Sequence, residues 1–137
     1  MIISTQTRYA VRFLLELSYS EEADRPTTLR QAADAQGISV AYLESIALKL
    51  RKRGYLKSYK GAGGGYTLAM PIEQITLGEI MRLMENKYFQ IHCAEDSEET
   101  CKNFSDCRIA KAWETLESHL TNVVDSVKLS QLSNKMV

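Results

Sequence analysis

The chain has 137 residues, of which 45% are hydrophobic, and this suffices for one compact domain with an appended element. The composition therefore argues against wholesale disorder. Its 17 basic and 17 acidic residues balance, no apolar run approaches the roughly 18 residues of a membrane-spanning helix, and no signal pattern opens the chain. We therefore expect a cytoplasmic protein that does not contact a membrane.

An apolar-rich segment occupies residues 1–20, and its hydrophobic side chains are too continuous for a solvated helix. We expect this segment to pack beneath the elements that follow it. A polar loop that contains one of the two prolines is predicted from Ser20 to Pro26.

Two helices separated by a short turn are predicted next. Thr28 and Gln31 form a capping box, and Gly37 can take the left-handed conformation that ends a helix. Ser39 can cap the second helix, which Gly54 ends. The expected buried face of this second helix recurs at the helical period and comprises Val40, Leu43, Ile46 or Ala47, and Leu50.

A small β wing follows the two helices. Tyr55–Tyr59 and Tyr66–Ala69 are predicted as short strands, joined by a glycine-rich tip at residues 61–65 and closed by Pro71. The chain between Lys49 and Lys60 carries no acidic residue. A helix that fits the major groove, followed by basic residues that neutralise phosphates, is typical of DNA binding, whereas the alternative is a solvated basic face. The basic residues are Lys49, Arg51, Lys52, Arg53, Lys57 and Lys60.

A second capping box, Thr76 with Glu79, predicts a further helix that carries Leu77, Ile80, Leu83 and Met84. Helical periodicity then stops in an acidic segment with three cysteines, Cys93, Cys101 and Cys107, in the pattern Cys-x7-Cys-x5-Cys. The pattern lacks the Cys-x2-Cys pairs of structural zinc sites, and soft thiolates suit an iron–sulfur cluster. The alternatives are zinc or three unrelated cysteines. The fourth cluster ligand stays open among solvent, the other subunit and the neighbouring His92, Glu95, Asp96, Glu98, Glu99 and Asp106.

The last helix is predicted to start near Cys107. Its apolar residues form a heptad stripe that is narrower than the buried face of most globular helices. The stripe favours a symmetric dimer through this helix, and the alternative is that the helix folds back onto its own domain. The residues of the stripe are Ile109, Trp113, Leu116, Leu120, Val123 and Val127.

The sequence resembles the bacterial winged-helix regulators typified by IscR, NsrR and RirA over nearly its whole length. The resemblance rests on RYAV at residues 8–11, ISVAYLESIALKLRKRGYL at 38–56, KGAGGGYTLA at 60–69, and the cysteine segment before a long helix. It implies a homodimeric, operator-binding transcription factor, with dimer helices that cross and a [2Fe-2S] or [4Fe-4S] cluster on Cys93, Cys101 and Cys107. Such regulators report iron supply, cluster status, nitric oxide or redox state.

The resemblance also implies roles for individual residues. Glu44 would contact bases, where a carboxylate accepts from a cytosine amino group, and Lys60 with Gly61 would enter the minor groove. The alternatives are that Glu44 pairs with Lys49 or Arg51 and that Tyr42 is packed. The complete expected DNA-binding set is Thr28, Ser39, Ala41, Tyr42, Glu44, Lys49, Arg51, Lys52, Lys60 and Gly61.

Two departures concern the fourth ligand. Ala110 stands where the IscR type has a histidine, and Arg8 stands where the NsrR type has an aspartate. The gap of seven between the first two cysteines is similar to that of RirA, which uses three cysteines.

We therefore predict a mainly α fold with a small β wing: a winged helix-turn-helix domain at 1–84, a cysteine loop at 85–107, and a dimerisation helix with its tail at 108–137. The expected function is a cluster-controlled transcriptional regulator, most simply a repressor, that binds a pseudo-palindromic double-stranded operator. The alternatives are the same dimer sensing thiol oxidation, zinc or a small metabolite, and a winged-helix interaction protein that does not read DNA. No nucleophile with a base and no phosphate-binding loop is present, so an enzyme is not expected.

Overall fold

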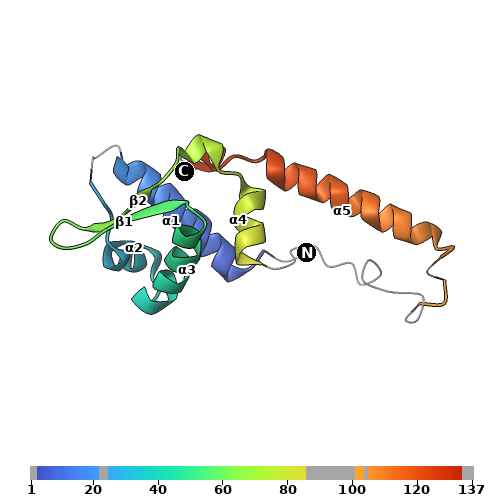
Figure 1. Cartoon of the computed structure of the whole chain (residues 1–137), viewed down its shortest axis with the longest axis horizontal. Coiled ribbons are helices and arrows are strands. Elements are labelled where there is room, and N and C mark those ends of the chain that lie inside the picture. Colours follow the sequence, from blue (N-terminus) through green and yellow to red (C-terminus); the bar gives the residue numbers. More distant parts are fainter. Residues whose placement is uncertain (1–2, 22–24, 86–100, 104, 134–137) are drawn as a thin grey trace.

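The computed structural model describes residues 3–21, 25–85, 101–103 and 105–133. It is mostly helical with one two-stranded antiparallel sheet, which confirms the predicted fold class. The elements are α1 (Thr5–Glu21), α2 (Leu29–Gln36), α3 (Val40–Lys52), β1 (Leu56–Tyr59), β2 (Gly65–Leu68), the 3-10 helix η1 (Ile72–Gln74), α4 (Leu77–Met84), α5 (Arg108–Ser126) and α6 (Leu129–Ser133). Figure 1 shows a compact head formed by α1 to α4, from which α5 extends as a separate arm. Across the described ranges, no helix is long and apolar enough to span a membrane.

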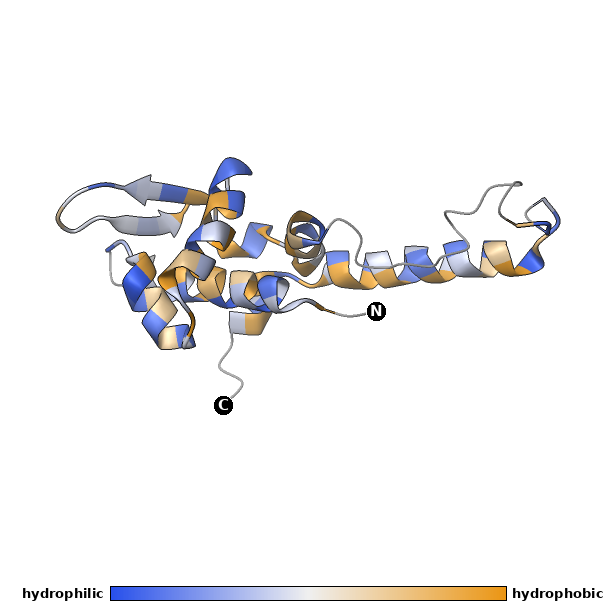
Figure 2. Cartoon of the chain, turned by 90° about the horizontal axis from the view of Figure 1, so that it is seen from below, coloured by the Kyte–Doolittle hydropathy of each residue, from blue (hydrophilic) through white to orange (hydrophobic). Residues whose placement is uncertain are grey.

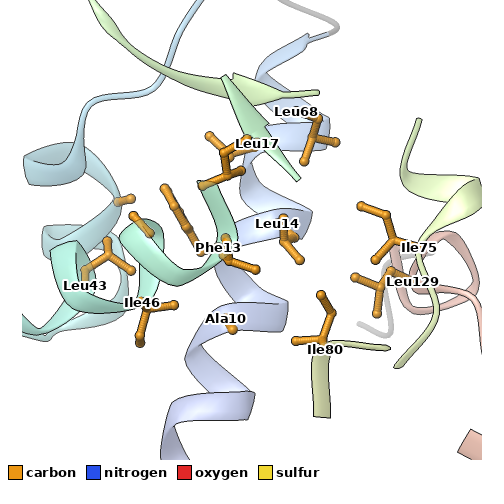
Figure 3. Packing of buried hydrophobic residues seen from close by; sticks show 14 of the residues in the cluster. Ala10, Phe13, Leu14, Leu17, Leu43, Ile46, Leu68, Ile75, Ile80 and Leu129 are labelled. Carbon is orange, nitrogen blue, oxygen red and sulfur yellow. The ribbon is translucent and has the colours of Figure 1, made fainter. Parts of the chain in front are cut away.

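Helix α1 is the centre of the hydrophobic core. Its fully buried side chains include Ala10, Phe13 and Leu14, with Leu17 one turn further on, so they follow the helical period and form one face. In Figure 3 this face lies between Leu43 and Ile46 of α3 on one side and elements from the C-terminal half of the head on the other. The expected packing of the N-terminal segment beneath the two following helices is confirmed.

The ends of α2 and α3 follow the predicted capping residues. Thr28 accepts a hydrogen bond from the backbone N–H of Gln31 at 3.2 Å, and Gly37 has φ 67° at the end of α2. The hydroxyl of Ser39 accepts from the backbone N–H of Tyr42 at 3.2 Å at the start of α3. The sequence therefore places the turn between the helices correctly, because both caps use local signals.

One boundary prediction and one core prediction differ from the structure. The first helix continues through Ser20, whose hydroxyl donates to the carbonyl oxygen of Glu16, so the loop begins later than predicted. Val40 was expected in the core and is 38% exposed, because it is the first residue of α3 and lies at the edge of the arc of buried side chains. The prediction that Gly54 ends α3 is confirmed, because Gly54 follows the C-cap Arg53 with φ 82° and its N–H donates to the carbonyl oxygen of Arg51 at 3.0 Å.

The two strands of the wing pair with Leu56 opposite Leu68 and Tyr59 opposite Gly65. Each strand starts one residue away from its prediction. Tyr55 is excluded from β1 because its N–H donates to the carbonyl oxygen of Leu50 and closes the end of α3. The glycine tip therefore spans a shorter segment than expected, since its last glycine pairs within β2.

The start of β2 is also joined to the segment before α2. The backbone N–H of Thr27 donates to the carbonyl oxygen of Tyr66 at 3.0 Å, and the reverse bond measures 2.8 Å. Gly65 has φ 145°, and a Cβ at this position would collide with the carbonyl oxygen of Thr27. Glycine is therefore required where the wing passes the start of the helix-turn-helix unit.

The chain returns to the head after α5. Leu129 is fully buried, and its N–H donates to the carbonyl oxygen of Ile75 at 2.9 Å. The N–H of Leu77 donates to the carbonyl oxygen of Val127 at 2.8 Å, and Thr76 forms a β-bridge with Lys128. Residues 108–137 are predicted as one appendage, whereas α6 packs in the head.

Candidate nucleic-acid interface and cysteine segment

One face of α3 is directed away from the core. Leu43, Ile46, Ala47 and Leu50 are fully buried and face α1. The opposite face carries side chains that are all exposed, and a helix presented in this way can enter a groove without losing its core contacts. The exposed face comprises Ala41, Glu44, Ser45, Leu48 and Lys52, and we call it the reading face of α3.

The carboxylate of Glu44 is available on the reading face. Within the described ranges Glu44 forms no ion pair. The structure therefore does not contain the alternative pair of Glu44 with Lys49 or Arg51. Lys49 instead donates from Nζ to Oε1 of Gln6 on α1 at 3.1 Å. This places the ammonium of Lys49 at the junction of α1 and α3, to one side of the reading face.

The start of α3 is held by aromatic packing as well as by its cap. The ring of Tyr42 meets the ring of Tyr9 edge-on, with 5.9 Å between centroids, and the guanidinium of Arg12 lies 5.7 Å from the centroid of Tyr9. Tyr42 is half-buried, and its ring is packed, as the alternative interpretation predicted. Thr28 is exposed, and its hydroxyl takes part in the capping box with Gln31.

The basic side chains continue from α3 into the wing. Arg51, Lys52 and Arg53 are exposed at the end of the helix, and Lys57 is exposed on β1. At the tip of the wing, Lys60 and Gly61 are exposed together, and Gly61 has φ 87° in open space. These exposed basic side chains lie on the last turn of α3, on β1 and at the tip of the wing, all of which belong to the head (Figure 1).

Two of the three predicted cysteine ligands lie within the described residues. Cys107 is the N-cap of α5 without a side-chain capping bond, and Cys101 precedes it in the adjoining turn. Both are half-buried free thiols. Cys93 and most of the alternative fourth ligands lie outside the described residues, and within those residues no group of three His, Cys, Asp or Glu side chains forms a metal site.

The predicted stripe on α5 is largely uncovered in the single chain. Ile109 and Val123 are 57% and 59% exposed, and Trp113 and Leu116 are also exposed. Figure 2 shows hydrophobic colour concentrated along one edge of α5 and hydrophilic colour along the other. Leu120 is half-buried. Val127 departs from the helical stripe, because it caps α5 and the chain turns back to the head there.

The join between α4 and α1 contains a residue that the sequence motifs did not indicate. The carboxylate of Glu85 accepts from the hydroxyl of Thr7 at 2.6 Å and from the backbone N–H of Ser4 at 3.0 Å. Burial raises the pKa of Glu85, but the bonds from Thr7 and Ser4 outweigh it, and the pKa lies below the ordinary value of 4.5. These partners are about 80 residues apart in sequence, so no local pattern could have identified them.

Comparisons with known proteins agree with this geometry. A family model described as Rrf2, iron-dependent transcriptional regulator, matches residues 3–135. The HTH-type transcriptional regulator IscR of Escherichia coli is 31% identical over 134 residues, which cover 98% of this chain and 81% of that protein. A crystal structure from Listeria innocua, described as that of a transcriptional regulator, matches with a TM-score of 0.82 at 31% identity and covers 100% of this chain and 89% of its own. CymR, the global cysteine regulator of B. subtilis, matches with a TM-score of 0.74 at 29% identity and covers 100% and 99% of the two chains.

Proposed function

Because the chain belongs to the Rrf2 family of transcriptional regulators, we propose that it binds operator DNA as a symmetric dimer, with α3 in the major groove and the wing beside it. Its membership is the one predicted from the sequence motifs, and the matching proteins are regulators rather than enzymes. The observation that carries the proposal is the reading face of α3, which is fully directed to solvent while the opposite face anchors the core.

We propose two kinds of DNA contact for the residues of α3 and the wing, namely contacts with base edges and contacts with phosphates. Glu44 and its neighbours on the reading face would meet base edges, where a carboxylate accepts from the amino group of cytosine. Lys52 at the end of that face, Arg51 beside it on α3 and Lys60 at the wing tip would neutralise phosphates. Thr28 caps α2 and Ser39 caps α3, while Tyr42 and Lys49 contact residues of α1. The roles that we propose for these four residues are to orient α3 and to contact the phosphate backbone.

The apolar stripe of α5 supports the proposal of a dimer. Four large hydrophobic side chains on one edge of an extended helix are exposed in the single chain, and a second copy related by two-fold symmetry would cover them. A dimer also gives two reading faces, which matches the two half-sites of a pseudo-palindromic operator. Ile109, Trp113, Leu116 and Val123 are the residues that we assign to this interface.

The DNA-binding proposal is tested by selecting duplexes from a random pool and measuring affinity by fluorescence anisotropy at several salt concentrations. Lys60→Gln should weaken binding to every selected duplex, and it should reduce the salt slope by about 0.9 for each phosphate that the lysine neutralises. Lys111→Gln is a matched control, because it removes the same charge on the side of α5 away from the stripe. If no duplex is enriched at low salt, the DNA-binding proposal fails, and the result favours the alternative of a winged-helix interaction protein.

We further propose that Cys93, Cys101 and Cys107 hold an iron–sulfur cluster that controls DNA binding. The donor set fits such a group, since thiolates are the ligands that iron–sulfur clusters prefer, and Cys101 and Cys107 are free and half-buried. When bound, the cluster would supply a centre that responds to iron supply, nitric oxide or oxidants. Cys107 caps the first turn of α5, so a ligand at its sulfur acts directly on the start of the proposed dimer helix.

The likeness to CymR favours a second form of control, in which the same dimer responds through its thiols or through cysteine-related metabolites. Protein purified without oxygen separates the two forms. Visible absorption together with matching iron and acid-labile sulfide would support the cluster, and Cys107→Ser should lose both. Colourless protein that resists anaerobic reconstitution, but whose DNA affinity changes reversibly with peroxide and thiol reductant, would establish thiol control instead. Zinc is tested by metal analysis of the same samples.

A further inference from the structure

A large hydrophobic side chain occupies the middle of the reading face. Leu48 is 48% exposed, although every other aliphatic side chain in the last three turns of α3 is buried against the core. The residues one turn before and after it, Glu44 and Lys52, are polar and exposed. The face therefore presents one large apolar side chain between an acidic and a basic residue.

The position of Leu48 on the helix is opposite to the core. At 3.6 residues per turn, it projects along the same line as Ala41 and Lys52, directly away from the buried arc of Leu43, Ile46 and Leu50. Leu48 is not among the side chains that form the hydrophobic core or pack against it. A partner that occupies this face must therefore present an apolar group to Leu48 and negative charge to the basic residues around it.

We propose that Leu48 determines operator specificity by contacting the C5-methyl group of a thymine in the major groove. This inference rests on the proposed function. Among the four bases only thymine presents a methyl group in that groove, and phosphates on both sides supply the negative charge that Lys52 and Arg51 require. Leu48 adds apolar recognition to the polar recognition assigned to Glu44.

The spacing along the helix restricts which base pairs the two residues read. Four residues of α-helix span about 6 Å, and base pairs rise about 3.4 Å each, so Glu44 and Leu48 would read positions about two base pairs apart when the helix follows the groove. The proposal therefore predicts a thymine about two base pairs from the cytosine recognised by Glu44, once in each half-site.

The experiment replaces each thymine of a selected operator, one at a time and in both half-sites, by deoxyuridine, which lacks only the methyl group. For the unaltered protein, one thymine in each half-site should be sensitive, with affinity reduced about fourfold per half-site, as expected for one buried methyl group. Leu48→Ala should bind the thymine operator more weakly and should not distinguish it from the deoxyuridine operator. Leu132→Ala is the matched control, since this leucine of α6 is 38% exposed and lies outside α3.

Circular dichroism and thermal unfolding establish that both leucine variants are folded, which their exposure leads us to expect. The proposal is overturned if the unaltered protein is indifferent to every deoxyuridine, or if Leu48→Ala keeps the sensitivity of the unaltered protein. Those two results leave DNA binding itself intact. Failure to select any duplex overturns the proposed function instead, and the two failures are therefore distinguishable.

Discussion

The contact between Glu85 and the start of α1 predicts a measurable stability effect. Glu85 is the first residue after α4, and the cysteine segment follows it. Its carboxylate accepts from the fully buried hydroxyl of Thr7 at 2.6 Å, a short distance typical of a charge-assisted bond, and from the N–H of Ser4. The side chain therefore holds the exit of α4 against the first turn of α1.

The substitution Glu85→Ala removes both acceptor contacts and leaves the hydroxyl of Thr7 as a buried donor without its acceptor. A hydrogen bond to a charged group contributes about 1.5 to 3 kcal/mol, and the side chain is half-buried, so we expect the free energy of unfolding to fall by about 2 kcal/mol. For a chain of this length, this corresponds to a decrease of roughly 6 to 8 °C in Tm. Glu85→Gln keeps an acceptor oxygen and should lose about half as much.

The pH dependence of the free energy of unfolding provides a second test of this contact. The folded-state pKa of Glu85 lies below the ordinary value of 4.5, so its contribution is fully present above that pH and is lost as the pH falls through the folded-state pKa. The stability difference between the unaltered protein and Glu85→Gln should therefore shrink on acidification below pH 4.5. The measurement is thermal or urea unfolding at one fixed protein concentration, because dimer stability depends on concentration.

A double-mutant cycle with Thr7→Val identifies the contact itself. The valine keeps the shape of Thr7 without its hydroxyl, so the double variant should be more stable than the sum of the two single losses predicts, by about 1 kcal/mol. Additive losses would show that Glu85 and Thr7 do not interact in solution. Equal stability of Glu85→Ala and the unaltered protein would refute the reasoning altogether.

Three further substitutions follow from the structure. Gly65→Ala should lower Tm and DNA affinity together, because its Cβ would strike the carbonyl oxygen of Thr27, whereas Gly61→Ala, in open space, should cost only the roughly 1 to 2 kcal/mol of a left-handed alanine in thermal unfolding. Leu116→Glu should convert the dimer to monomer in sedimentation velocity while circular dichroism of the head is retained, and Thr115→Glu, which adds the same charge off the stripe, should remain dimeric. Leu129→Ala should reduce the free energy of unfolding by about 2 to 5 kcal/mol, since its side chain is fully buried, whereas Leu132→Ala on the same helix should lie within about 0.5 kcal/mol of the unaltered protein.

Local chemistry explains which parts of the fold were predictable. The capping boxes at Thr28 and Thr76 were predicted from pairs three residues apart, and both form in the structure. Gly37, the left-handed glycine at the end of α2, was also predicted from the local sequence and is found in the structure. Each of these signals is read within one helical turn, so the sequence alone contains the whole interaction.

Contacts between distant segments explain what was missed. Nothing around Leu129 indicates that it enters the core, because its partner Ile75 is far away in sequence and a leucine near a chain end is equally compatible with a frayed tail. Within the interface, the stripe of α5 was predicted from its heptad spacing, whereas Leu48 was missed because its exposure is defined only after α3 has been oriented by its buried face. The assignments of bases, phosphates and cluster ligands remain predictions.

Helix α4 connects the arm to the reading surface through contacts at both of its ends. At its start, the N–H of Leu77 bonds to Val127 just past α5, and at its finish Glu85 bonds to the first turn of α1. The ion pair between Arg82 and Asp125 is partly exposed and adds little, so the backbone pairs hold the junction. Because α1 also packs directly on α3, a change in the direction of α5 either breaks these bonds or moves the reading face with it. Close-packed interiors resist gradual deformation, so such a change would act as a switch between two arrangements of the head and the arm.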